Sequence, residues 1–169
     1  MDIFSIFTTS CGIGAIISHM DRVDKKILSL LQNDARMTIT ALADAAHVSV
    51  SACHRRLKEL ERSGVIEGYT AKLSPAAVGL GFQAIVFLTM RSGDAGILKD
   101  FEAAISAIPE VTDADRLFGD PDFLVRVSTT DLPAFQKLYD ESLTTLPGVL
   151  KLTTTLIMKS VVESRPAPF

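Results

Sequence analysis

Hydrophobic residues in the first half of the chain recur at intervals of three and four, which is the spacing of an amphipathic helix. One such run lies within residues 21–33, where Asp21 or Asp24 can cap the helix N-terminus. A second, shorter run follows Thr38, another favourable N-cap residue, and ends near His47. Two short helices are therefore expected, with buried faces formed by Val23, Ile27, Leu30, Leu31, Ile39, Leu42, Ala43 and Ala46.

A third helix is expected from Ser49 to about Ser63, because Ser49 can cap its start and Gly64 can adopt the left-handed conformation that ends a helix. This helix has two chemically different faces. The face toward the core is expected to hold Val50, Cys53, Leu57 and Leu60. The opposite face is polar and cationic and carries Ser51, His54, Arg55, Lys58 and Arg62.

Residues 65–73 follow the third helix and predict a short β-hairpin around Gly68. The second and third helices are separated by a turn of only three or four residues, which is typical of a helix-turn-helix. Three helices followed by a hairpin predict a winged helix-turn-helix at residues 20–73.

The pattern changes after a connecting segment, 74–81, that contains Ser74, Pro75, Gly79 and Gly81. Beyond it, strands are expected at 82–90, 111–118, 123–128 and 149–162, with one helix through 97–105 that Pro109 ends and another from Asp131 through Leu143. The order β-α-β-β-α-β is a split βαβ repeat, which forms a four-stranded antiparallel sheet with both helices on one face. A second subunit is expected to bury the other face, which holds Ile85 and Phe87.

The predicted fold class is therefore α+β, with a winged helix-turn-helix followed by a ferredoxin-like βαββαβ domain. We assign residues 1–19 to an N-terminal extension, 20–73 to the helical domain, 74–81 to a linker, 82–163 to the sheet domain and 164–169 to a tail.

The composition and the N-terminus narrow the location of the protein. With 47% hydrophobic and 22% charged residues, the chain of 169 residues is an ordinary globular protein. Its two cysteines, Cys11 and Cys53, have no CxxC spacing and form no disulfide framework, as expected in a reducing cytoplasm. Residues 1–19 are apolar, but Asp2 stands where a signal peptide carries Lys or Arg, and the middle of the segment is polar. We expect neither a signal peptide nor a membrane partner.

The charge of the chain is distributed unevenly between its two halves. Residues 20–73 contain nine basic and seven acidic side chains and so have a net charge of +2. The remaining residues have a net charge of −5, which brings the whole chain to −3. A weakly cationic N-terminal domain followed by an acidic C-terminal domain is consistent with binding to an anionic partner through the N-terminal domain.

The third helix has the side chains that a recognition helix needs for double-stranded DNA. In a helix-turn-helix, this helix enters the major groove and its N-terminal residues reach the base edges. Arg55 can donate two hydrogen bonds to guanine, and Ser51 and His54 can contact bases or phosphates. Lys58 and Arg62 can neutralise phosphates, and Thr38 and Ser49 place helix N-termini where phosphates bind. A merely solvated cationic face is the alternative.

Other kinds of chemistry have less support in the sequence. His47, Cys53 and His54 do not make a metal site, because Cys53 and His54 are expected on opposite faces and a fourth ligand is missing. We find no catalytic residues, phosphate-binding loop or cofactor motif. Two alternatives to a DNA-binding regulator stay open: a metabolite-sensing partner protein that does not bind DNA, and a metabolic enzyme with a ferredoxin-like domain.

The sequence between Met20 and Pro166 resembles the Lrp/AsnC family, the leucine-responsive regulatory protein and asparagine regulator family of transcription regulators. The matching stretches are DRVDKKILSLLQNDARMT, VSVSACHRRLKELERSGVIEGYTAKLSP, FGDPDFLVRV and LPGVLKLTTTLIMKSV. The resemblance implies homodimers formed by packing of the C-terminal sheets, with further assembly to tetramers or octamers, and sequence-specific binding to double-stranded DNA.

The resemblance also implies an effector, an amino acid or related metabolite, that binds between subunits in the domain 82–163. By position, Gly119, Asp120 and Asp122 match the family's ligand-binding turn. Pro121 stands where many relatives have an aromatic residue. From the residues alone, Asp120 and Asp122 are either turn formers or a carboxylate pair that holds an ammonium group.

Overall fold

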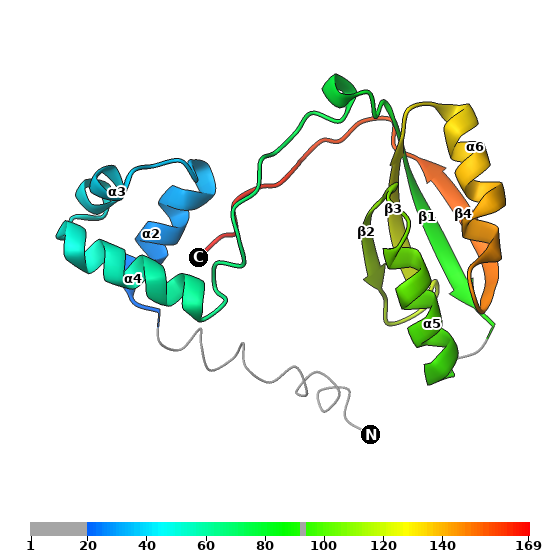
Figure 1. Cartoon of the computed structure of the whole chain (residues 1–169), viewed down its shortest axis with the longest axis horizontal. Helices are drawn as coiled ribbons and strands as arrows, with labels where there is room; N and C mark the ends of the chain where they lie inside the picture. Colours follow the sequence, from blue (N-terminus) through cyan, green and yellow to red (C-terminus); the bar gives the residue numbers. More distant parts are fainter. Residues whose placement is uncertain (1–19, 92–93) are drawn as a thin grey trace. The chain divides into compact units, whose positions relative to one another are not determined.

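The computed structural model describes residues 20–91 and 94–169, so the extension predicted at 1–19 lies outside the described residues. The chain divides into two compact units, which we describe separately. One unit, called the head here, contains the described residues up to Ala71 together with Val162–Phe169, and the other contains Lys72–Val161 (Figure 1).

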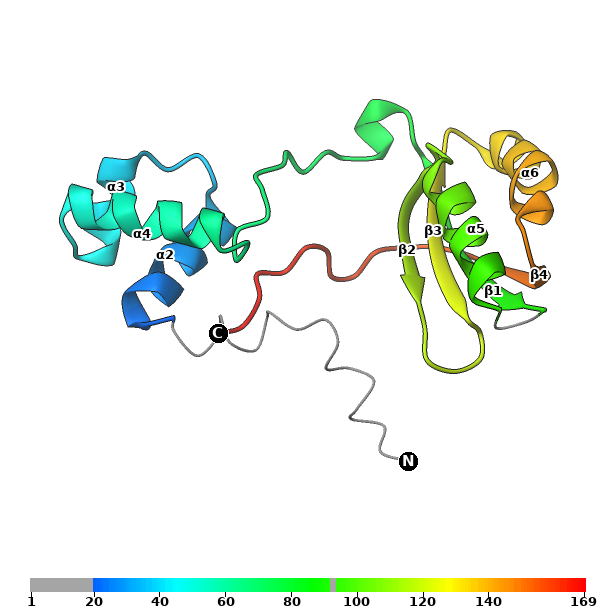
Figure 2. The same ribbon diagram turned by 60° about the horizontal axis from the view of Figure 1, so that its bottom comes forward.

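The head contains three helices: α2 (Arg22–Asn33), α3 (Ile39–Ala46) and α4 (Val50–Arg62), as predicted (Figure 2). Asp21 caps α2 by accepting hydrogen bonds from the N–H groups of Val23 and Asp24, at 2.8 and 2.9 Å. The Asp24 carboxylate in turn accepts from the Asp21 N–H, so the two residues form a capping box. These short-range bonds explain why the start of α2 could be predicted from the sequence.

The core of the head is small and lacks aromatic residues. Its buried hydrophobic side chains come from all three helices: Ile27, Leu28, Leu42, Ala43, Ala46, Cys53 and Leu60. The prediction that Val50 faces this core is wrong, because its side chain is exposed. Val50 is the first residue of α4, and the buried residues of this helix, Cys53 and Leu60, lie further along it.

The β-hairpin predicted around Gly68 is also not formed: residues 65–73 contain no strand. An isolated two-stranded hairpin is only marginally stable in water. Here the chain makes other contacts instead, since Val65 and Ile66 pack on the core of the head and the Tyr69 hydroxyl lies 2.9 Å from a carboxylate oxygen of Glu61 in α4.

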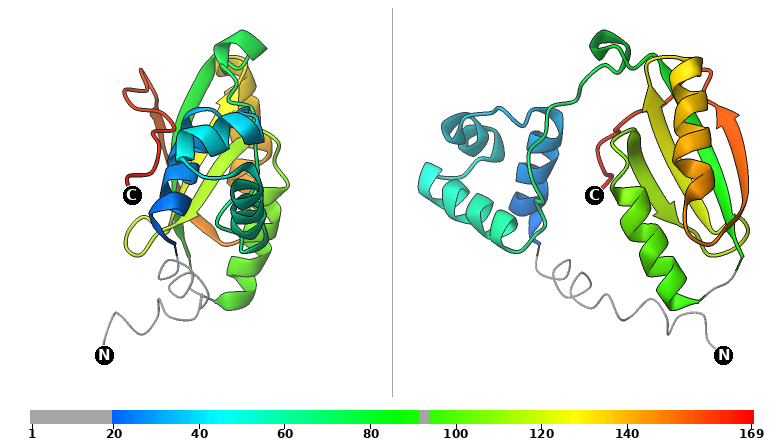
Figure 3. Two further views of the ribbon diagram at one scale, coloured as in Figure 1. Left: turned by 90° about the vertical axis from the view of Figure 1, so that its left-hand side faces the viewer. Right: turned by 45° about the vertical axis from the view of Figure 1, so that its right-hand side comes forward.

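The second unit is the predicted split βαβ domain. Its elements are β1 (Phe82–Met90), α5 (Ala95–Ser106), β2 (Val111–Arg116), β3 (Phe123–Thr129), α6 (Leu132–Glu141) and β4 (Val149–Leu156). The strands form one antiparallel sheet in the order β2-β3-β1-β4, with α5 and α6 on the same face (Figures 1 and 3). A short helix, η3 (Ala76–Val78), lies in the connecting segment before β1.

Three predicted element bounds differ from the structure by two residues or more. β4 ends at Leu156 rather than residue 162, because its partner β1 begins at Phe82 and Leu156 already lies opposite Ala84. β2 ends at Arg116, two residues earlier than expected. Leu143 belongs to a separate turn, η4 (Leu143–Thr145), after α6 has ended.

The two faces of the sheet differ in burial. Ala84, Val86 and Leu88 of β1 are fully buried against the helices. Phe101 of α5 and Phe123 of β3 are also buried there, with ring centroids 4.5 Å apart. Ile85 and Phe87 alternate with these residues and are only partly buried. They lie on the face that the helices leave open, as the sequence predicted.

Candidate nucleic-acid interface

The turn between α3 and α4 consists of His47, Val48 and Ser49. His47 adopts the left-handed conformation, with φ 57° and ψ 45°, and ends α3. The Val48 N–H donates to the Ala43 carbonyl at 3.0 Å, the bond that is typical of a Schellman cap. This tight connection gives the two helices the arrangement of a helix-turn-helix.

The structure brings the predicted DNA-binding residues of α4 to one exposed surface. Ser51, His54, Arg55, Lys58 and Arg62 are all exposed, whereas Cys53 and Leu60 are buried on the opposite side of the helix. We call these five exposed residues the cationic face. Solvent-exposed donors on one side of a recognition helix can reach base edges and phosphates without rearrangement of the core.

Thr38 and Ser49 lie at the N-caps of α3 and α4. Their hydroxyl oxygens accept hydrogen bonds from the N–H groups of Ala41 and Ala52, at 3.2 and 3.3 Å. The Ser49 and Ser51 hydroxyl oxygens lie 3.2 Å apart. A capping hydroxyl uses an oxygen lone pair and keeps its own proton, so each remains able to donate to a phosphate oxygen.

Arg56 anchors α4 to the start of α2, a role that the sequence analysis missed. One of its guanidinium nitrogens lies 2.7 Å from a carboxylate oxygen of Asp21 and 2.8 Å from one of Asp24. A hydrogen bond from the Asp24 backbone N–H is the main cause that lowers the pKa of Asp21, and Arg56 lowers it further. The position of Arg56, three residues after the buried Cys53, was a signal for an inward-facing arginine.

Glu59 is a second residue that the sequence analysis did not identify. The guanidinium Nε of Arg62 donates to Glu59 Oε2 at 3.0 Å, and a second nitrogen pairs with Oε1, so the contact is bidentate. This pair raises the pKa of Arg62 and lowers the pKa of Glu59. Arg62 is therefore already paired within α4, and a phosphate has to compete with Glu59 for it.

The structure separates the residues considered for a metal site. Cys53 is fully buried, and burial raises the pKa of its thiol, whereas His54 is exposed. In the ranges 20–91 and 94–169, no group of three or more His, Cys, Asp or Glu side chains is placed to hold a metal ion. Within the same ranges, no helix is long and apolar enough to cross a membrane.

The candidate effector turn, Gly119–Asp122, follows β2 and contacts β1. The Asp122 carboxylate accepts a hydrogen bond from the Met90 N–H at 2.7 Å, where the pairing of β1 with β4 shifts register. The Thr89 hydroxyl donates to Asp120 Oδ1 at 3.2 Å, and Asp120 is exposed. The two carboxylates thus differ: Asp122 satisfies the backbone, whereas Asp120 remains open to solvent.

These features define a class of protein: a helix-turn-helix DNA-binding protein with a separate ferredoxin-like domain. Family models match both parts, the "Winged helix-turn-helix DNA-binding" model at residues 20–67 and the "Lrp/AsnC ligand binding domain" model at residues 83–167. The chain belongs to the Lrp/AsnC family, and it is a DNA-binding transcription regulator rather than an enzyme.

Full-length relatives support the same assignment. The leucine-responsive regulatory protein of Salmonella typhimurium is 34% identical over 145 residues, which cover 86% of this chain and 88% of that protein. The DNA-binding transcriptional activator DecR of Escherichia coli is 30% identical over 149 residues, which cover 88% of this chain and 98% of the relative.

Solved structures of regulators are similar throughout both domains. A transcriptional regulator from Neisseria meningitidis, solved as a complex with L-Met, has a TM-score of 0.83 and 33% identity and covers 88% of this chain and 96% of its own. An AsnC family regulator from Agrobacterium tumefaciens has the same TM-score at 30% identity, with 88% and 97% covered. The assignment to a winged helix-turn-helix domain and a four-stranded sheet domain is thereby confirmed, although residues 65–73 form no hairpin in this structure.

Proposed function

We propose that this regulator reads DNA through the cationic face of α4. The observation that carries the proposal is the exposure of Ser51, His54 and Arg55 in the first half of the helix that follows the helix-turn-helix turn. In this position, Arg55 reads guanine, whereas Lys58 and Arg62 contact phosphates on either side. The Thr38 and Ser49 hydroxyls add phosphate contacts at the two helix N-termini.

Fluorescence anisotropy on DNA from upstream of the regulator's own gene, compared with random DNA at two salt concentrations, tests this proposal. Arg55→Ala should weaken binding to the upstream DNA by about 1–3 kcal/mol and relax the preference at one base pair. Lys58→Ala should weaken binding to both DNAs equally and reduce the salt dependence by about one unit. Arg22→Ala on α2 is the matched control for loss of one positive charge. Equal losses on both DNAs for Arg55→Ala would show that Arg55 reads no base.

We further propose that the sheet domain binds an amino acid or a related metabolite next to the turn Gly119–Asp122. The domain matches a ligand-binding family model, and a solved relative contains L-Met. Asp120 can pair with the ammonium group of such a ligand because its carboxylate is exposed and makes one hydrogen bond to the side chain of Thr89. Gly119, at φ 142°, leaves room beside it for the ligand.

Isothermal titration with individual amino acids tests the effector proposal. Asp120→Asn should remove heat of binding while it preserves the hydrogen bond from Thr89. Asp122→Asn is the comparison, because it removes a negative charge from the same turn but keeps an oxygen that can accept the hydrogen bond from the Met90 N–H, so amino-acid binding should be retained. Unchanged amino-acid binding in Asp120→Asn would exclude Asp120 as the ammonium partner.

The active form is proposed to be a cytoplasmic homodimer, or a higher assembly of dimers, formed through the open face of the sheet. Ile85, Phe87 and Leu124 lie on this face without helices above them. A second copy that covers this face would bring two heads to one DNA molecule. Analytical ultracentrifugation of Phe87→Glu should show monomers, whereas Lys99→Glu on the helical side should remain a dimer.

A further inference from the structure

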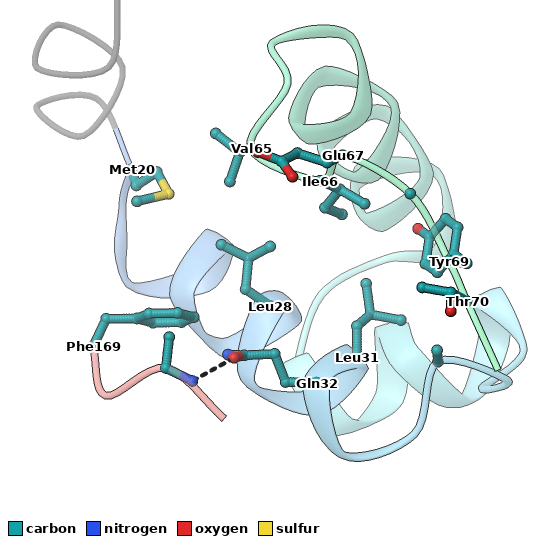
Figure 4. A pocket seen from close by; sticks show the side chains of 13 residues that line it. Met20, Leu28, Leu31, Gln32, Val65, Ile66, Glu67, Tyr69, Thr70 and Phe169 are labelled. Atoms are coloured by element: carbon teal, nitrogen blue, oxygen red, sulfur yellow. Dashed lines mark hydrogen bonds between the residues drawn. The ribbon is translucent and has the colours of Figure 1, made fainter. Parts of the chain in front are cut away.

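The head contains a cavity of about 500 Å³ beside α2 (Figure 4). Leu28 and Leu31 of α2 form one wall, and Val65 and Ile66, which follow α4, form another. These side chains are apolar, so the cavity can bind an apolar group. Neither the proposed DNA contacts nor the effector turn uses this cavity.

The C-terminal segment of the same chain lies against this cavity. Ala167 and Phe169 line it, and the Ala167 N–H donates to Gln32 Oε1 of α2 at 2.6 Å (Figure 4). Ala167 stands between Pro166 and Pro168, neither of which has an N–H group to donate. The two prolines also limit the conformations of the free segment, which lowers the entropy lost when it binds.

The segment leaves the sheet next to the linker. In the sheet domain, Leu156 at the end of β4 lies opposite Ala84 of β1, and the Ile157 N–H donates to the Gln83 carbonyl at 3.1 Å. The linker therefore enters β1 at the end of the sheet where the C-terminal segment departs from β4. Docking of Val162–Phe169 on α2 closes a loop of chain between the sheet and the head.

We propose that the cavity beside α2 is a docking surface for the chain's own C-terminal segment, Val162–Phe169, and that the docked segment is a second tether between the head and the sheet domain. Two tethers restrict the orientations of the head more than the linker alone. The docking stands independently of DNA binding, whereas the role of the tether rests on the function proposed above.

Disulfide trapping in the full chain tests the docking. Gln32→Cys with Ala167→Cys, in a background with Cys11→Ser, should crosslink under mild oxidation and run as a monomer on a non-reducing denaturing gel. Lys26→Cys with Ala167→Cys is the control, because Lys26 is exposed on α2 but does not line the cavity. A failure to crosslink, or a rate equal to that of the control, overturns the docking. A covalent dimer overturns the assignment to the chain's own segment and favours exchange between copies.

Hydrogen exchange provides a second measurement that needs no crosslink. Phe169→Ala should increase amide exchange severalfold in the segment 65–70, and Arg165→Ala, outside the cavity, should leave it unchanged. An equal effect of both variants, or of neither, overturns the docking.

DNA with two half-sites tests the tether. A chain that ends at Val161 should bind a single half-site like the full chain but two half-sites roughly tenfold more weakly, because the second head is less restricted. If the full chain crosslinks as expected but the shortened chain binds two half-sites with the same affinity as the full chain, the tether is overturned and the docking is not. If the full chain does not bind a single half-site at all, the result contradicts the proposed function instead.

Discussion

The helical core of the head and the sheet domain are stabilised in different ways. The head buries seven hydrophobic side chains without an aromatic ring, and its helices begin at the side-chain caps Asp21, Thr38 and Ser49. Among its described residues, the sheet domain buries fourteen hydrophobic side chains, including Phe101, Phe123 and Phe135. A small core leaves polar contacts, such as those of Arg56, a larger share in fixing the geometry of the head. Helix α4 is thus held partly by electrostatic contacts, whereas the sheet domain depends on close packing.

The largest effect is expected from Phe101→Ala in the sheet domain. Phe101 is fully buried against Phe123, so the change should reduce the free energy of unfolding of that domain by about 3–5 kcal/mol. Each domain contains one tyrosine, so Tyr69→Phe and Tyr139→Phe backgrounds allow urea unfolding of each to be followed by tyrosine fluorescence. The transition reported by Tyr139 should shift and that reported by Tyr69 should not. A joint shift would contradict the separation of the two cores.

A smaller effect is expected from Arg56→Met, which preserves the aliphatic part of the side chain but removes its ion pairs with Asp21 and Asp24. Because the network is only partly buried, the loss of stability in the head should be about 1 kcal/mol. The transition reported by Tyr69 measures it. Arg22→Met is the matched control, since Arg22 is exposed at the start of the same helix. Equal stability of the two variants would show that the network does not hold α4.

The thermal stability of the head should fall at low pH, because the Asp21 carboxylate becomes protonated. The pKa of Asp21 in the folded head lies below its ordinary value of 3.8, so the carboxylate stabilises the fold above that pH. The contribution is lost as the pH falls through the lowered pKa, when the folded head also takes up the proton. Asp21→Asn preserves the cap without the charge. The difference in melting temperature between the original protein and this variant should narrow from pH 6 to pH 2.5. A constant difference would show that the charge of Asp21 does not stabilise the head.

The smallest effect is expected from Glu59→Gln. This change frees Arg62 from its bidentate pair and removes a negative charge beside the cationic face. Binding to random and upstream DNA should tighten a few-fold, with a salt dependence steeper by about one unit. Glu67→Gln is the control for charge alone. An identical gain in both variants would mean that Arg62 already reaches the DNA in the original protein.

Much of the fold could be predicted because the signals are local. The caps Asp21, Thr38 and Ser49 bond to N–H groups two or three residues away, so α2, α3 and α4 begin where the sequence placed them. The alternation in β1 likewise placed Val86 and Phe87 on opposite faces. The pair between Glu59 and Arg62 was also within reach, because residues three apart on a helix are neighbours.

The sequence by itself determined the two-part architecture, the helix starts and the cationic composition of α4, because caps and periodicity act over a few residues. Only the tertiary structure decided that Arg56 pairs with Asp21 and Asp24, that β4 ends at Leu156, and that residues 65–73 form no hairpin. It also placed the C-terminal segment on α2, 135 positions away in the sequence. Such contacts depend on partners distant in the chain, and no local pattern in either partner specifies the other.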